Sequence, residues 1–288
     1  MTTTTTTTTT APAGRVTHEE TRARFSDLLA AEWLKTWSLR STPWLYVITA
    51  LAVIAFNAGT AYDHYKYWYQ HDGQSRTSFI ANGIPLVDAF TANSAMVLVL
   101  ALAAIGAVSV TGEYGTGLIR TTFTAVPARR SVMAAKALVL ASVTTVFGAL
   151  VAAASFASAQ AILSGRNASV SLDHPDALRV IAASALLAPV AALAGLAIGT
   201  VIRHTGGSVV ACVVVLLLLP VVLSARRHLT AVLLHTLPFS AWERLTSTDT
   251  QRSNDLFPWT TAGAWTVYVV WALAAGTVTV FAAHRRDQ

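Results

Sequence analysis

Residues 111–136, TGEYGTGLIRTTFTAVPARRSVMAAK, form a polar and basic segment between two long apolar runs. A chain that only turned back at a membrane surface would need a handful of residues, whereas this segment has more than twenty. A loop of this length, with an acid, glycines, a proline and several basic residues, is typical of a docking surface for a soluble partner. The residues that stand out in it are Glu113, Gly115, Gly117, Arg120, Pro127, Arg129, Arg130 and Lys136.

The composition of the whole chain indicates a membrane protein. Of its 288 residues, 54% are hydrophobic and only 12% are charged, and the mean hydropathy is +0.54. Soluble domains carry about 25% charged residues. The one cysteine, Cys212, lies in an apolar run, so the sequence predicts no disulfide. Residues 1–16, mostly threonine, lack an apolar core and are predicted to form a disordered tail and not a signal peptide.

Six charge-free apolar runs are long enough to cross a bilayer, which takes about 20 residues. The sequence therefore predicts an all-α membrane protein whose six-span domain occupies residues 43–288. The third run would measure roughly 40 Å as a helix, so it must tilt or project beyond the hydrocarbon. A further stretch, residues 229–242, is too short to span and contains Pro238. It is predicted to be a re-entrant or interfacial helix pair outside the membrane. The six predicted spans are residues 43–62, 89–111, 137–163, 180–202, 207–225 and 260–283.

The basic residues predict the orientation. With a cytoplasmic N-terminus, 12 of the 20 arginines and lysines lie on the inner side, together with 6 of the 14 acids. The whole net charge of +6 then faces the cytoplasm, and the outer side is neutral. Only three residues are lysines, a bias that indicates a GC-rich bacterial genome. We therefore expect a multi-pass protein of a bacterial plasma membrane with both termini in the cytoplasm.

The apolar runs contain no Asp, Glu, Lys, Arg or His, although Asp88 and His204 lie at their edges. Ion-driven carriers place ionisable groups at mid-membrane, and intramembrane hydrolases need a nucleophile with its base, or paired carboxylates, at that depth. The sequence also lacks a GxxxxGK[ST] phosphate loop. We therefore expect no catalytic residue, no cofactor, no metal site and no nucleic-acid partner. Any energy for vectorial work must come from another protein.

Residues 17–42, which precede the first span, are predicted to form an amphipathic helix in the inner interface. Two interpretations remain open: a membrane anchor alone, or a helix that also contacts a partner. The apolar stripe consists of Phe25, Leu28, Leu29, Trp33 and Trp37, and the charged residues off the stripe include Glu32, Lys35 and Arg40.

A second short helix is predicted within the 111–136 segment and should end before Pro127. One of its faces consists of Leu118, Ile119, Thr122 and Phe123. From these residues alone, docking competes with an ordinary basic inner loop.

Several residues near the spans allow two interpretations each. Asn57, Asn93 and Ser94 either line a pathway or form hydrogen bonds between helices. Leu218 and Leu219, which precede Pro220, form either a hydrophobic constriction with a kink or a packed leucine run.

Two further pairs of residues are better explained by packing and by the membrane interface than by a specific site. Gly195 and Gly199 form a GxxxG pattern, for which packing within the chain is favoured over a dimer contact. His64 and His71 lie in an aromatic cluster that indicates an interfacial belt, with metal binding as the minor alternative.

Taken together, these motifs resemble the permease subunits of ABC-2-type ATP-binding-cassette exporters. The resemblance rests on AEWLKTWSLRSTPW (31–44), on EYGTGLIR (113–120) followed by Pro127, Arg130 and Lys136, and on LHTLPFSAWERL (234–245). It covers nearly the whole chain beyond the threonine tail.

The resemblance implies six spans with an N-terminal elbow helix, a cytoplasmic coupling helix between spans two and three, and an extracellular segment between spans five and six. It implies a dimer, with itself or a paralogous permease, above two copies of a separate ATPase. The pathway would lie between the permeases, mainly against spans two and five. A membrane sensor or immunity subunit that has the same fold and transports nothing is the alternative, and an intramembrane enzyme is a further rival. On this analogy the coupling helix is formed or braced by Glu113, Gly115, Thr116, Arg120, Pro127 and Arg130, and the elbow carries Glu32 and Lys35.

Overall fold

The computed structural model describes residues 24–70, 72–223, 227–247 and 257–285, of which 85% are helical and none lies in a strand. Six helical stretches are long and apolar enough to cross a membrane, which confirms the prediction of an all-helical, six-span protein. They are α2 (Ser41–Tyr67) with a 3₁₀ turn (Trp68–Gln70), α4 and α5 (Ile84–Asp88, Ala92–Thr116), α7 (Arg129–Ser164), α8 (Ala177–Ile202), α9 to α10 (Thr205–Val222) and α14 (Thr261–Arg285). The tail of residues 1–16, the first part of the predicted elbow and His71 lie outside the described residues.

The helices extend beyond the apolar runs that predicted them. Helix α7 has 36 residues and begins at Arg129, eight residues before the expected start of the third span. Because a helix does not end where the hydrocarbon ends, charged residues near the run edges belong to the long helices themselves. Asp63, His64, Glu113 and Lys136 therefore lie on helices, at their ends, and can pair between neighbours.

Helix α8 lies at the centre of the bundle and packs against α5, α7 and α14. Its contact with α5 is the most extensive in the structure and depends on small residues. A Cβ added at Gly195 would collide with the backbone carbonyl of Ala103, and one added at Gly106 would collide with that of Ala192. The GxxxG pattern thus serves packing within the chain, as the sequence predicted.

The fifth and sixth spans cover one side of the bundle and leave much of their surface exposed. The fifth consists of α9 (Thr205–Cys212), a π-helical turn (Val213–Leu218) and α10 (Leu219–Val222). Pro220 lacks an N–H and so cannot donate to the preceding turn, which favours an irregular helix there. The sequence left two interpretations open before Pro220, a constriction with a kink or a packed leucine run. The structure has a π-turn there, and Leu218 and Leu219 are exposed.

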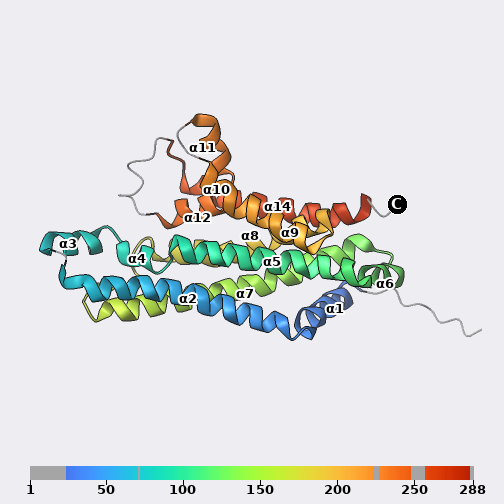
Figure 1. Ribbon diagram of the computed structural model, residues 1–288, viewed down its shortest axis with the longest axis horizontal. Helices are drawn as coiled ribbons and strands as arrows, with labels where there is room; N and C mark the ends of the chain where they lie inside the picture. Colours follow the sequence, from blue (N-terminus) through green and yellow to red (C-terminus); the bar gives the residue numbers. More distant parts are fainter. Residues whose placement is uncertain (1–23, 71, 224–226, 248–256, 286–288) are drawn as a thin grey trace, which may run out of the picture.

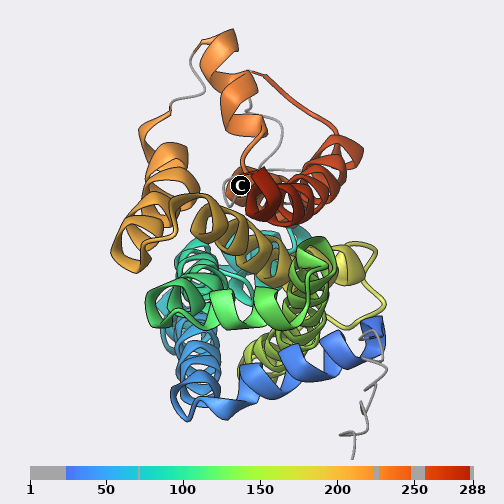
Figure 2. The ribbon, with the colours of Figure 1, turned by 90° about the vertical axis from the view of Figure 1, so that its right-hand side faces the viewer.

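The bundle is elongated, and its two ends differ (Figure 1). We call one end the basic end: it carries α1 (Phe25–Ser38), α6 (Leu118–Ala125), the start of α7 and the end of α14. Seen from this end, α1 and α6 lie across the ends of the long helices (Figure 2). We call the other the aromatic end: it carries the end of α2, α3 (Gly73–Ala81) and α4.

The predicted helix pair between spans five and six is present as α11 (His228–His235) and α12 (Pro238–Thr246). Helix α12 packs against α8 and α14, and Trp242 donates a hydrogen bond from Nε1 to Ser184 Oγ at 3.1 Å. Helix α11 projects from the body of the protein (Figure 1), and its Leu229 is 78% exposed.

Candidate functional site

Helix α1 lies against the first turns of α7. Its Leu28 is buried with Val132 and Ala135 of α7. Residues four apart share one face of a helix, so Glu32 points the same way as Leu28, into the protein. The helix therefore delivers a carboxylate to the interior beside the start of the third span.

Most of the apolar stripe predicted for α1 is exposed, and one residue placed off the stripe, Glu32, is buried. Leu28 is buried, but Phe25, Trp33 and Trp37 are 42–50% exposed. Large exposed aromatic side chains on a helix at the end of a membrane bundle suit the lipid interface. Because an apolar stripe faces lipid as readily as a protein core, the sequence alone does not show which side of α1 packs on the bundle.

Four charged side chains from α1, α5 and α7 meet at the basic end, and we call them the charge network: Glu32, Lys35, Glu113 and Lys136. Lys136 Nζ lies 2.6 Å from Glu32 Oε2 and 2.9 Å from Glu113 Oε1. Lys35 Nζ lies 2.7 Å from Glu32 Oε1 and 3.3 Å from Glu113 Oε1. Lys136 Nζ is also 3.5 Å from the carbonyl oxygen of Ser109. Each lysine thus contacts both acids.

The charge network is neutral and largely buried, although the side chain of Lys35 is 29% exposed and that of Glu113 is 11% exposed. Glu32 is 4% exposed and Lys136 is 6% exposed. Removing two ions from water costs several kcal/mol each, and close pairing with further hydrogen bonds offsets that cost. Because two positive and two negative charges balance, loss of any one member leaves a buried charge without compensation. The network therefore favours one packing arrangement of α1, α5 and α7 over others.

The titration behaviour of the α1 members follows from this pairing. Burial acts to raise the pKa of Glu32, but the charge of Lys136 and the hydrogen bonds from Lys136 and Lys35 outweigh it, so the pKa lies below its ordinary value. Burial acts to lower the pKa of Lys35, but the hydrogen bond to Glu32 and the charge of Glu113 raise it above its ordinary value. Both residues are charged at neutral pH.

Helix α6 is the predicted short helix of the 111–136 segment, and it ends at Ala125, before Pro127. Gly117 separates it from α5 with a φ of +73°, a conformation that L side chains rarely adopt. Its Ile119 is buried and Phe123 is half-buried, whereas Arg120 is exposed. The helix thus packs one face on the bundle and presents another outward.

The residues predicted for docking occupy different positions. Glu113 belongs to the charge network, where it braces α5. Thr116 donates a hydrogen bond from Oγ1 to the carbonyl of Gly112 at 2.9 Å. Arg130 lies over the ring of Phe281, with its Cζ atom 5.0 Å from the ring centroid, and so joins α7 to α14. Gly115, Arg120 and Pro127 are exposed, as is Arg40 at the start of α2.

Lys136 stands out in the 111–136 segment, but the sequence did not predict that it pairs with Glu32 and Glu113. A signal was available, because lysine occurs only three times in the chain and two of the three are in the network. Tyr114 and Arg203 were also missed. The Cζ atom of Arg203 lies 4.8 Å from the centre of the Tyr114 ring, at the end of α8.

The predicted pathway residues divide between the interior and the surface. Asn57 is fully buried and donates from Nδ2 to Ser155 Oγ at 3.1 Å, while its Oδ1 accepts from the backbone N–H of Thr91 at 3.0 Å. It therefore joins α2, α5 and α7, which supports the alternative of hydrogen bonds between helices. Ser94 is buried, and with Asn57 it lines a cavity of about 20 Å³, room for about one water molecule. Asn93 is exposed.

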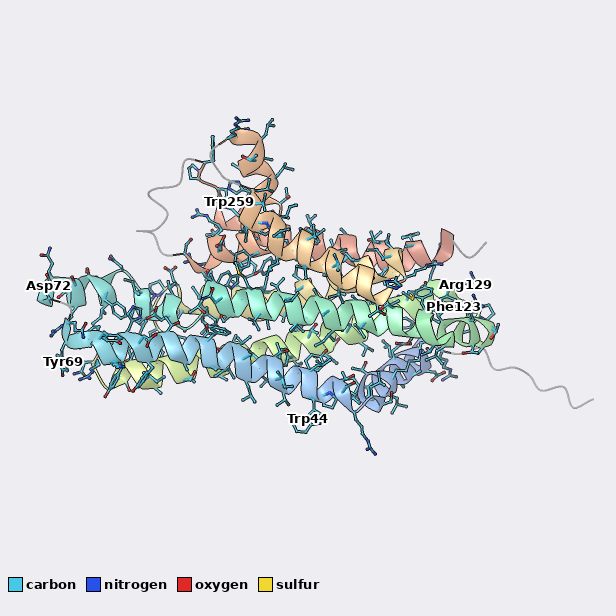
Figure 3. The ribbon with its side chains drawn as sticks, viewed as in Figure 1. Trp44, Tyr69, Asp72, Phe123, Arg129 and Trp259 are labelled. Atoms are coloured by element: carbon cyan, nitrogen blue, oxygen red, sulfur yellow. The ribbon has the colours of Figure 1, made fainter. Side chains whose placement is uncertain are left out.

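At the aromatic end, His64 and Arg166 make separate contacts that share no partner with one another. His64 Nδ1 lies 2.6 Å from Asp88 Oδ2. The guanidinium of Arg166 lies between the rings of Tyr65 and Tyr69, 4.2 and 4.5 Å from their centroids. Among the described residues, no group of three or more His, Cys, Asp or Glu side chains is placed to bind a metal. Figure 3 marks this end by Tyr69 and Asp72, and the basic end by Phe123 and Arg129.

Comparison with known proteins adds no family to these findings. No protein-family model matches the chain, and no curated protein matches it. The fold and the two ends are therefore the observations from which function is argued.

Proposed function

We propose that the chain is the membrane-spanning permease subunit of an ATP-driven exporter of the ABC-2 type, and that a separate ATPase binds at the basic end. The observation that carries the proposal is α6, a short helix that exposes Arg120 and lies across the ends of the long helices beside the charge network. The EYGTGLIR motif at residues 113–120 covers the last turn of α5, the Gly117 turn and the start of α6.

The arrangement can transmit force. A load on α6 passes through the Gly117 turn to α5 and through the short connection at Pro127 to α7. Glu113 of α5 and Lys136 of α7 are joined directly. On α1, Glu32 pairs with Lys136 and Lys35 pairs with Glu113. Since bistable packed elements amplify small shifts, a push on α6 would tilt these helices together. ATP binding on the partner would then shift the protein between inward- and outward-facing populations.

The partner must hydrolyse ATP, because the sequence of this chain has no phosphate loop. In this proposal Arg120 of α6 contacts the ATPase, and Glu113 acts indirectly by holding α5 to α7. Orientation follows from charge: the basic end faces the cytoplasm of a bacterial cell, and α11 and α12 face outward.

A second permease, a further copy of this chain or a paralogue, would pair through the exposed side formed by the fifth and sixth spans. Cys212 does not report on this contact, because its thiol is buried in its own chain. We therefore expect dimer formation through Val210→Cys in a Cys212→Ser background, since Val210 is 62% exposed on α9. Val146→Cys on α7, exposed to a similar degree, is the matched control and should crosslink less.

Site-specific photo-crosslinking in the native cell tests the docking surface. A photoreactive amino acid replaces Thr121 on α6, and the control carries it in place of Gln74 on α3 at the opposite end; both positions are exposed. We expect the Thr121 probe to capture a soluble protein that carries a nucleotide-binding phosphate loop, and the Gln74 probe to capture none.

Capture of no such protein from a well-expressed, membrane-inserted chain contradicts the docking proposal. Capture without any ATP-dependent export activity of the reconstituted complex would favour the sensor or immunity role, which shares the fold. The Arg120→Glu variant supplies the second readout, because it reverses one exposed charge without touching the charge network and should abolish capture.

A further inference from the structure

Asp88 is a buried carboxylate at the aromatic end, where it is the last residue of α4. Its side chain is 7% exposed, and its one charged partner in the described part of the chain is His64 of α2, whose Nδ1 atom lies 2.6 Å from Asp88 Oδ2. A buried charge is costly unless a partner compensates it. Since that partner is an imidazole that is 34% exposed, the compensation depends on whether the ring carries its proton.

The other charged groups at the aromatic end leave this dependence in place. At this end α5 and α7 carry no charged residue. No cation other than His64 lies within 4.0 Å of the Asp88 carboxylate in the part of the chain that the structure describes. Asp63 adds a second negative charge beside His64. The charged side chains on the elements around the pair are Asp63 and Lys66 of α2, Arg76 of α3, Arg166 after α7, and Asp176 and Arg179 at the start of α8.

His64 joins both α3 and α4 to α2. Its ring centroid lies 5.0 Å from that of Phe79 on α3, and Phe79 also packs edge-on against Trp68. Helix α4 has a further contact with α7, because Gln160 donates from Nε2 to the carbonyl oxygen of Pro85 at 2.9 Å. Helices of nine and five residues have little stability of their own. The α3–α4 segment (residues 73–88) is therefore held at the end of the bundle by few contacts (Figure 1).

This segment continues directly into the wall of the cavity beside Asn57, which we call the inner cavity. Phe90, two residues after Asp88, is 4% exposed and lines the inner cavity together with Asn57 and Ser94. The next residue, Thr91, donates its backbone N–H to Asn57 Oδ1 at 3.0 Å. A displacement of α4 would move Phe90 and disturb this hydrogen bond. The position of α4 therefore determines whether the inner cavity is closed toward the aromatic end.

We propose that His64 and Asp88 form a pH-dependent contact that holds the α3–α4 segment closed over the inner cavity. When His64 is protonated, opposite charges pair and the carboxylate is compensated. When the imidazole loses its proton, the carboxylate is left buried beside a neutral ring, and movement of α4 gives it access to water. The contact is therefore strong at acid pH and weakens as the pH rises and His64 is deprotonated. This proposal concerns the chain alone and does not depend on the transport proposal.

Hydrogen–deuterium exchange of the full-length chain in lipid nanodiscs tests the proposal. Exchange is followed in peptides from α3–α4 and from α8 between about pH 5.5 and about pH 8.5, with labelling times scaled for the intrinsic effect of pH on exchange. We expect protection of the α3–α4 peptides, relative to those of α8, to fall about tenfold or more as the pH rises across this range. His64→Gln, which carries no charge, should show the low protection at every pH. Asp88→Asn should show a protection that does not change with pH.

The matched controls are His174→Gln and His71→Gln, which remove imidazoles elsewhere in the chain. Both should keep the pH dependence of the wild type. Constant protection of the α3–α4 segment in the wild type overturns the proposal, as does a pH dependence that persists in Asp88→Asn or disappears in either control. The α8 peptides report on the bundle as a whole, so a variant that has unfolded is recognised by their loss of protection, and the other variant of the pair then decides.

Access to the inner cavity is measured separately with Ser94→Cys in a Cys212→Ser background, because Ser94 is buried and lines the cavity. At a fixed pH of about 6, a small uncharged thiol reagent should react several-fold faster when His64→Gln is added. Thr121→Cys on α6, an exposed position at the basic end, should react at the same rate with and without His64→Gln. Equal rates for Ser94→Cys in the two backgrounds contradict the claim that the α3–α4 segment covers the cavity.

Discussion

The two ends of the bundle hold their charges in different ways. At the aromatic end the contacts of His64 and Arg166 are separate, and that of Arg166 with Tyr65 also joins distant parts of the chain, 101 residues apart. At the basic end four charges from α1, α5 and α7 form one buried network, and its longest link joins Glu32 to Lys136 across 104 residues of sequence. The two contacts at the aromatic end thus have no partner in common, whereas the charge network joins three elements through shared partners. The difference supports the proposal that an applied load reaches the spans at the basic end.

The largest expected effect comes from breaking the charge network. Lys136→Met leaves Glu32 and Glu113 buried with only Lys35 between them, and removal of one partner from a buried ion pair costs about 3–5 kcal/mol. We expect a large loss of thermal stability in detergent, measured by a fluorescence-detected unfolding transition. The matched control, Lys66→Met at the aromatic end, removes the remaining lysine of the chain and should have little effect.

A double variant separates charge balance from side-chain packing. Glu32→Gln/Lys136→Met removes one charge of each sign and leaves Lys35 paired with Glu113. It should be more stable than Lys136→Met alone, because no buried carboxylate lacks compensation. If the stability losses of the single variants Glu32→Gln and Lys136→Met simply add in the double variant, the four residues do not act as one network.

A smaller effect is expected at the aromatic end from Arg166→Met. The guanidinium has two ring contacts and donates from Nε to the carbonyl of Tyr65 at 3.2 Å. Loss of these contacts should cost about 1–2 kcal/mol. The stability loss of Arg166→Met is measured by the same fluorescence-detected unfolding transition. A loss as large as that of Lys136→Met would remove the distinction between the two ends.

The smallest effect concerns pH within the neutral range. The lowered pKa of Glu32 gives stability that is complete above its ordinary pKa of 4.5 and is lost as the pH falls through the lowered pKa. The raised pKa of Lys35 gives stability that is complete below its ordinary pKa of 10.5 and is lost as the pH rises through the raised pKa. The network contribution should therefore stay constant between these limits and decline beyond them. Unfolding temperatures across pH check this, and in Glu32→Gln the decline at acid pH should be reduced.

The helices were predictable from the sequence because hydrocarbon imposes a length on apolar runs. Helix α6 was predictable from Pro127 and its apolar spacing, and the α11–α12 pair from a run too short to span. The orientation of α1 was not, because Trp33 and Trp37 are as apolar toward lipid as toward a core. The charge network was not, because pairing between residues as distant as Glu32 and Lys136 depends on helix packing. Asn57 shows the same limit, since a polar residue in a span suits a pathway and a hydrogen bond equally until its partners are known.

The most direct test of the central claim is purification of the tagged full-length chain in mild detergent from its native cell, followed by mass spectrometry of the bound proteins. The account predicts a stoichiometric soluble ATPase with a phosphate loop, which is retained by the wild type and by Lys66→Met and lost in Arg120→Glu. An intact, folded chain that purifies without any such protein would contradict the claim that the basic end is a docking surface.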